Sequence, residues 1–145
     1  MNTSRWAAWL AGLWGGTLLG IGLIGAPAGF ATTLPELAGR VAGRMFTQEA
    51  YLSLALAIVL FLLLRAQARR AAQGGGGSVL NGDMLLVLGT LFCTVAGYFA
   101  LQPMMAAARA GQGAWSFGAL HGVSVGFYAL KALLVLVLAW RLSAR

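Results

Sequence analysis

Long apolar segments constrain this chain more than any other feature of its sequence. Three of them reach the roughly 20 residues that a membrane-spanning helix needs: they run from about Trp6 to Phe30, from Met84 to Met105 and from Trp115 to Trp140. A shorter one, Tyr51 to Leu64, reaches that length only by including turns of the preceding "MFTQEA", which leaves Gln48 and Glu49 near the interface or against protein. Because a backbone in lipid must satisfy its own hydrogen bonds, all four segments are predicted to be helices.

The sequence therefore predicts an all-α integral membrane protein with a single domain over residues 1–145. It is a four-helix bundle, with helices at about 6–30, 46–66, 84–105 and 115–140. The composition agrees, since 60% of the residues are hydrophobic and only 9% are charged, against about 25% charged in soluble domains. The net charge of +7 comes from arginines at the ends of the apolar segments. The expected partner is thus the lipid bilayer and not nucleic acid.

The distribution of arginines predicts the orientation. With four spans, both termini and the connection between the second and third helices lie on one side of the membrane. That side holds six arginines and the opposite side holds three: Arg5, Arg65, Arg69, Arg70, Arg141 and Arg145 against Arg40, Arg44 and Arg109. The positive-inside rule then places both termini in the cytoplasm, and we expect a bacterial inner membrane protein.

Two connections carry their own patterns. In "PELAGRVAGRMF", Glu36, Arg40 and Arg44 follow one another at four-residue spacing and share a helix face. This predicts a short amphipathic helix lying at the interface between helices 1 and 2, with Arg40 and Arg44 as its interfacial residues. Residues 71–83, "AAQGGGGSVLNGD", predict a flexible glycine-rich cytoplasmic loop, whose "GGGGS" resembles both natural loops and laboratory linkers.

The first helix is rich in glycine. Gly12, Gly16 and Gly20 recur every fourth residue, a spacing that lets helix backbones approach closely. The row either packs inside the bundle or docks a partner, which would be a second copy of the chain or a larger membrane complex. Pro27 removes a backbone donor and is expected to kink or end this helix.

A polar stripe interrupts the apolar surface of the fourth helix, and the third helix carries a matching row. At about 100° per residue, the polar residues of each row fall on one side of their helix. Because a short loop joins these two helices, the rows are expected to face each other inside the bundle. The predicted solute-binding or pore-lining residues are His121, Ser124, Tyr128 and Lys131 on the fourth helix and Thr94, Tyr98 and Gln102 on the third.

Lys131 is the costliest member of the stripe. It lies ten residues from Arg141, or about 15 Å at 1.5 Å per residue, and a lysine at a helix centre costs roughly 2.5–3.5 kcal/mol on insertion scales. No acidic residue is expected at its depth. We therefore predict an unpaired lysine, which indicates a wetted cavity or an anionic ligand, or else a side chain that snorkels to the cytoplasmic surface.

Catalytic and metal chemistry have weak sequence support. There is no nucleophile–base pair with an orienting acid, no paired carboxylates and no phosphate-cradling loop, so the chain is not expected to be an enzyme. No cofactor is predicted. Copper or haem is the alternative, with His121, Met104, Met105 and Met45 as weak candidate ligands in the outer half. Cys93, the single cysteine, is expected to be a packing residue.

The chain resembles a known family of small four-helix membrane proteins. Its front carries "LWGG" and "GAPAGFATTLPELAGRVAGRMF" and its back carries "FGALHGVSV". In order and spacing these are similar to transmembrane protein 205 and bacterial relatives with a domain of unknown function. The resemblance implies a four-helix membrane protein with no established reaction. It also implies a distant similarity to four-helix membrane proteins associated with copper uptake. Tyr128 and Lys131 depart from the pattern of the resembled family.

Three functions follow from these patterns. The leading hypothesis is a protein that binds or passes a small solute through a polar seam between helices 3 and 4. The first alternative is a structural or assembly subunit of a membrane complex. The second is a copper- or haem-binding membrane protein. An unpaired lysine at mid-depth favours the first hypothesis, because a seam that only joins helices does not need one.

Overall fold

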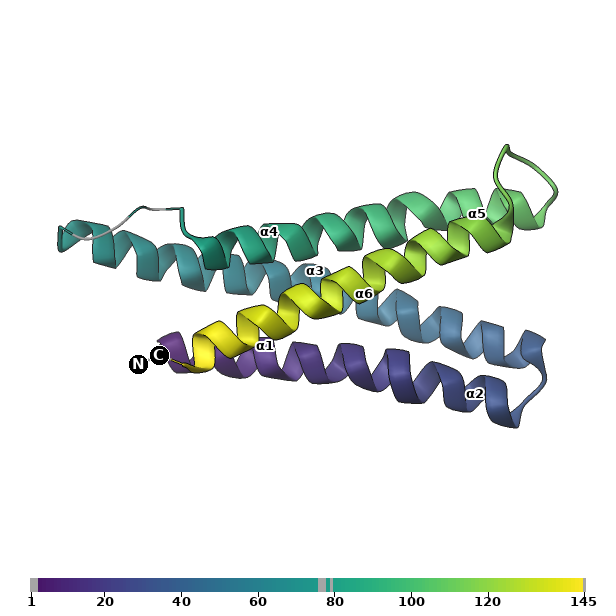
Figure 1. Ribbon diagram of the computed structural model, residues 1–145, viewed down its shortest axis with the longest axis horizontal. Coiled ribbons are helices and arrows are strands. Elements are labelled where there is room, and N and C mark those ends of the chain that lie inside the picture. Colours follow the sequence, from purple (N-terminus) through teal and green to yellow (C-terminus); the bar gives the residue numbers. More distant parts are fainter. Residues whose placement is uncertain (1–2, 76–77, 79, 145) are drawn as a thin grey trace.

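The computed structural model describes residues 3–75, 78 and 80–144, and within them the chain folds into an all-α four-helix bundle (Figure 1). The four long helices are all long and apolar enough to cross a membrane, which confirms the predicted fold class. The first consists of α1 (Thr3–Leu19), η1 (Gly20–Gly25) and α2 (Ala26–Thr32), and the second is α3 (Pro35–Gln73). The third consists of α4 (Gly82–Thr94), η2 (Val95–Ala100) and α5 (Leu101–Arg109), and the fourth is α6 (Phe117–Ser143).

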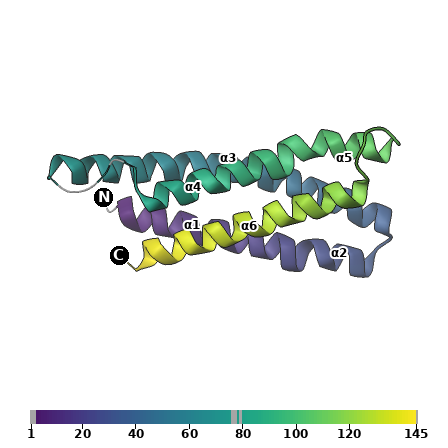
Figure 2. The same ribbon diagram turned by 45° about the horizontal axis from the view of Figure 1, so that its top comes forward.

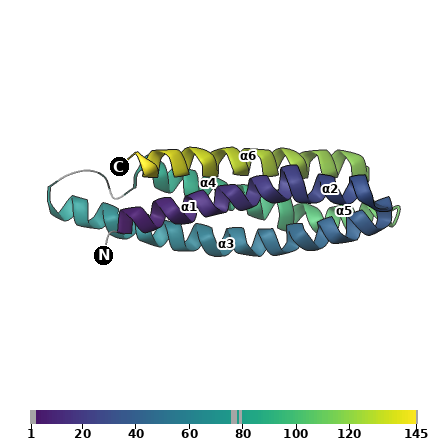
Figure 3. The same cartoon turned by 90° about the horizontal axis from the view of Figure 1, so that it is seen from below.

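The helices run alternately up and down, so α1 and the end of α6 lie at the same end of the bundle (Figures 1 and 2). α1 packs between α6 and α3, and α4 packs against the same two helices (Figure 3). This arrangement places one face of every spanning helix toward a common axis.

The prediction of a separate interfacial helix between helices 1 and 2 is wrong. The amphipathic segment is helical, but it forms the first turns of α3, which continues without interruption for 39 residues. Pro35 occupies the start of this helix, where its missing N–H costs nothing, and no proline follows within it. The predicted flexible stretch 71–83 is also shorter than expected. α3 continues to Gln73, and α4 begins at Gly82 after an Asn81 cap; residues 76, 77 and 79 lie outside the described part of the chain.

Pro27 does not end the first helix. A π-helical segment, η1, lies just before it, and the same arrangement recurs where η2 precedes Pro103. Proline cannot donate to the carbonyl four residues back, and its ring crowds that carbonyl. The wider π-helical turn accommodates the mismatch, so both helices continue beyond the proline.

The half of the bundle nearest the termini, which we call the closed half, has a packed apolar core. The core includes residues from all four spanning helices, and Trp14, Leu60 and Leu138 within it are completely or almost completely buried. Its members are Ala7, Ala11, Trp14, Leu18, Ala57, Leu60, Leu64, Ala68, Met84, Val87, Val135, Leu138 and Leu142. The opposite half, which we call the open half, has only a small buried cluster of Leu101, Met105 and Leu120.

Candidate functional site: a cavity that ends on a buried ion pair

The open half contains a cavity of about 970 Å³. All four spanning helices line it, and the wall that α3 supplies runs from Glu36 down to Glu49. Glu49 lies thirteen residues beyond Glu36, which corresponds to a depth of about 20 Å at 1.5 Å per residue. Arg40 and Arg109, both exposed, lie with Glu36 near the ends of their helices and form the mouth. The cavity therefore leads from the end of the bundle opposite the termini to its middle.

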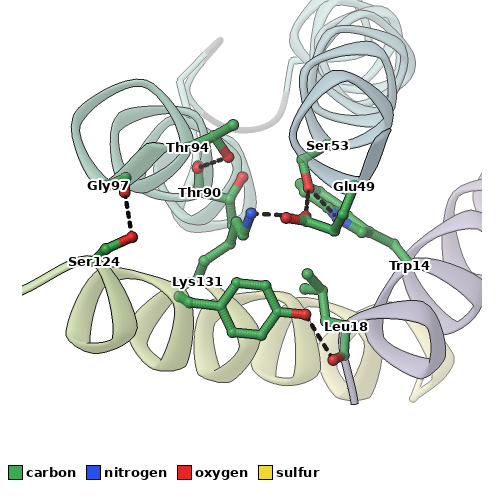
Figure 4. A network of polar contacts seen from close by, with 10 residues as sticks. Trp14, Leu18, Glu49, Ser53, Thr90, Thr94, Gly97, Ser124 and Lys131 are labelled. Atoms are coloured by element: carbon green, nitrogen blue, oxygen red, sulfur yellow. Dashed lines mark hydrogen bonds and ion pairs between the residues drawn. The ribbon is translucent and has the colours of Figure 1, made fainter. Parts of the chain in front are cut away.

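The floor of the cavity is an ion pair. Lys131 Nζ lies 2.7 Å from Glu49 Oε1, and each side chain is only 3% exposed. Figure 4 shows Lys131 reaching from α6 and Glu49 from α3 toward each other between the helices. Burying two charges is costly unless each is compensated, and here each residue compensates the other.

Two further residues form hydrogen bonds behind the Glu49 carboxylate. The hydroxyl of Ser53, one turn further along α3, donates to the same Glu49 oxygen, and Trp14 Nε1 donates to Ser53 Oγ over 2.9 Å (Figure 4). Trp14, Ser53 and Glu49 thus form a chain of donors and acceptors that ends on Lys131. This chain ties α1, α3 and α6 together at the boundary between the two halves.

The prediction of an unpaired Lys131 is wrong. The sequence left Glu49 either near the interface or against protein, because the purely apolar run begins only at Tyr51, and it did not pair Glu49 with Lys131. In the structure α3 begins at Pro35, so Glu49 lies fourteen residues into the helix and reaches the depth of Lys131. A usable signal was present: a lysine at mid-depth needs a carboxylate, and Glu49 is the only acidic residue of the predicted helix 46–66.

The remaining polar residues of the fourth helix reach different neighbours. Ser124 Oγ donates to the Gly97 carbonyl in η2 over 2.7 Å, and so follows the predicted pairing of helices 3 and 4 (Figure 4). Tyr128 instead donates to the Leu18 carbonyl of α1 over 2.8 Å. His121 is exposed and lines the cavity, where its ring stacks on Phe117 at 5.7 Å between centroids.

The polar row of the third helix is divided. Tyr98 and Gln102 line the cavity, and the Tyr98 hydroxyl lies 2.6 Å from Thr47 Oγ1 of α3. Thr94 is buried and donates to the Thr90 carbonyl of its own helix over 2.9 Å. The predicted residues of both rows therefore do not form a seam between two helices. Six of the seven surround a cavity shared by four helices: His121, Ser124, Tyr128, Lys131, Tyr98 and Gln102.

The other candidate residues are placed as follows. Arg40 lines the cavity, whereas Arg44 is exposed and is not part of its wall. Met105 is buried in the wall, Met104 is exposed, and Met45 packs against Gly25. Among the described residues no three His, Cys, Asp or Glu side chains are grouped as metal ligands. Copper or haem at His121 with the methionines stays a prediction.

The glycine row of α1 does not pack inside the bundle. A Cβ atom built on Gly12, Gly16 or Gly20 meets nothing within 4 Å. Gly12 and Gly16 are exposed, so this part of the row lies on the outer surface of α1. Of the two interpretations from the sequence, internal packing is therefore wrong, and docking of a partner stays a prediction.

Comparisons with curated proteins and with solved structures find no match. A family comparison does, over residues 9–114, which cover the first three spanning helices and the connection that leads to α6. The matched family is described as a domain of unknown function, DUF4149. The chain is thus an integral membrane protein that belongs to the DUF4149 family.

Proposed function

We propose that this protein binds a small solute in the cavity of its open half. The observation that supports the proposal is the cavity of about 970 Å³ that ends on Glu49 and Lys131. Ligand sites are typically concave and mostly apolar, with a few placed polar groups, and have volumes of roughly 300–1,000 Å³. Charged residues within spanning segments are expensive, and they commonly mark substrate or ion pathways.

The proposal assigns binding and not catalysis. The cavity-lining side chains include no Ser, Cys or His hydrogen-bonded to an orienting acid. Passage of the solute is a further step of the same proposal, and it requires the closed half to open. If the termini are cytoplasmic, as the arginine distribution predicts, the mouth opens on the outer side of a bacterial inner membrane. The resemblance to the transmembrane protein 205 family implies a four-helix membrane protein and adds no reaction to the proposal.

Cysteine accessibility tests this proposal. In a Cys93→Ser background, His121→Cys and Ser124→Cys place thiols on the cavity wall, whereas Val123→Cys places one on the exposed outer face of the same helix turn. With the protein in liposomes, a water-soluble thiol reagent should label the two cavity positions much faster than position 123, because thiols in lipid do not ionise. Equal, slow labelling at all three positions would overturn the proposal.

A second candidate function, a subunit of a larger membrane assembly, has one supporting observation. Gly12 and Gly16 are exposed on α1 with open space beyond them. Small residues at such spacing are common where spanning helices associate. Gly12→Leu/Gly16→Leu should then abolish any self-association or co-purifying partner, measured by crosslinking in native membranes. Gly39→Leu, on the wall of the cavity, is the control that should not.

A further inference from the structure

We infer that the ligand of the cavity is an amphiphile with an anionic head group, taken from the surrounding lipid leaflet. The inference rests on the proposed function and names the class of solute. Four features carry it: the charge of the mouth, the apolar middle of the cavity, the neutral floor, and an opening toward lipid.

The mouth carries a net positive charge. Two guanidinium groups, Arg40 and Arg109, and one carboxylate, Glu36, line it. Neither arginine takes part in either ion pair of the described residues, which are Lys131–Glu49 and Arg141–Asp83. Arg109 lies over the Phe117 ring at 4.4 Å, a contact that leaves its N–H groups available. A guanidinium matches carboxylate and phosphate oxygens in geometry and in charge, so an anionic group is favoured at this level.

The middle of the cavity is mostly apolar. Between the mouth and the floor the wall includes Phe30, Phe46, Met105 and Val125, and a few polar side chains, Tyr98, Gln102, His121 and Ser124, interrupt it. A fully polar solute would lose most of its hydration here and find few hydrogen-bond partners to replace it, which is costly. An acyl or aryl body meets the same surface without that loss. The wall therefore selects a molecule with an apolar part behind its head group.

The floor excludes a second anion. Glu49 and Lys131 already neutralise each other at 2.7 Å. An anionic group that approached Lys131 would lie beside the Glu49 carboxylate, and like charges at that distance repel strongly in a medium of low dielectric constant. The inner end of the ligand is therefore uncharged, so its single negative charge belongs at the mouth.

The side of the cavity is open between α2 and α6. No residue of α2 is buried, and Pro27, Phe30 and Val125 both line the cavity and are exposed. The two helices diverge toward the end of α2 in both views (Figures 1 and 2). In a membrane this side faces hydrocarbon, so an amphiphile can enter from the leaflet with its head already at the level of Arg40 and Arg109.

Protection of a cavity thiol tests the inference. The protein carries Cys93→Ser with Ser124→Cys, or with His121→Cys as a second variant, and is labelled in liposomes with and without three ten-carbon probes. Decanoate, decanol and decyltrimethylammonium share a tail and differ in the charge of the head. Decanoate should slow labelling about tenfold, the effect expected for hydrogen bonds to a charged group, and the other two should have little effect. The matched control, Arg40→Gln/Arg109→Gln, should lose the protection by decanoate at the same membrane surface charge.

The outcomes separate this inference from the proposed function. Equal protection by all three probes, or none by any, would overturn the anionic amphiphile and leave the cavity as a solute site. If decanoate still protects the thiol in Arg40→Gln/Arg109→Gln, the two arginines do not bind the head group, and the role assigned to the mouth would be overturned. Absence of labelling at both cavity positions without any probe would overturn the proposed function, and this inference with it.

Discussion

The two halves of the bundle are built from the same four helices but differ in what lies between them. In the closed half α1, α3, α4 and α6 meet around Trp14, Leu60 and Leu138, which are completely or almost completely buried. In the open half the same four spanning helices, around and beyond η1 and η2, surround a cavity of about 970 Å³. The difference indicates that packing in the closed half stabilises the bundle. The Glu49–Lys131 pair lies at the boundary between the closed and the open half. Four predictions test this division.

The largest effect is expected at the boundary itself. Glu49→Gln or Lys131→Met leaves one buried charge without its partner, and each should reduce the free energy of unfolding by about 3–5 kcal/mol. The double variant should lose less than either single variant, because it removes both charges together. Unfolding in mixed detergent micelles measures this. Single variants as stable as the double variant would show that the pair does not hold the boundary.

The second prediction compares one large-to-small change in each half. Leu138, in the closed half, is fully buried, and Leu138→Ala should cost about 2–5 kcal/mol, as for cavities in packed cores. Val125, in the open half, is 53% exposed, and Val125→Ala should change stability by less than about 0.5 kcal/mol. The same unfolding assay applies to both. Similar losses in the two halves would contradict the division.

The third prediction concerns a close approach of two helices in the open half. A Cβ atom on Gly97 would lie 2.3 Å from Cβ of Phe127, so η2 and α6 touch there only because residue 97 has no side chain. Gly97→Ala should cost about 1–3 kcal/mol through overpacking. Gly12→Ala, which meets nothing within 4 Å, is the control and should cost nothing. Thermal unfolding monitored by circular dichroism distinguishes the two, and a neutral Gly97→Ala would mean that η2 and α6 can separate freely.

The smallest effect is expected at the hydrogen bond from Trp14 to Ser53. Trp14→Phe keeps an aromatic ring in the closed half but removes the Nε1 donor, at a cost of about 1 kcal/mol. Trp9→Phe is the control: it also removes an indole N–H donor, but from a residue that is 65% exposed, so the free energy of unfolding should not change. If both substitutions are neutral in the unfolding assay, the donor chain behind Glu49 contributes nothing to the boundary.

The fold was largely predictable because it depends on length and hydropathy. Four apolar segments give four spanning helices, and only their ends were misplaced. The error at α3 has a physical cause. Its first turns are amphipathic, which is typical of an interfacial helix, yet nothing between Pro35 and the apolar run breaks the backbone. A helix continues until a helix-breaking residue ends it. A change from polar to apolar residues along the sequence does not show where that happens.

The site was predictable residue by residue but not in its pairings. The polar stripe of the fourth helix was identified, and all four of its members line the cavity. The partner of Lys131 was missed, because depth along α3 depends on where that helix begins. Tyr128 reaches a backbone carbonyl of α1, and no side-chain pattern on α1 signals such an acceptor. Contacts to backbone atoms are set by how helices pack, which a single sequence does not encode locally.

The length of α3 makes the connection after it a suitable site for an internal tag. Its 39 residues correspond to about 58 Å, against a hydrocarbon thickness of about 30 Å. The last turns of α3 extend past the start of α1 (Figure 3), so we expect them to project beyond the membrane at this end of the bundle. An epitope or fluorescent domain inserted after Gln73 would follow the projecting end of α3. It would lie away from the lipid head groups and from the cavity at the other end of the bundle. The chain can thus be tagged internally without changing any residue that lines the cavity.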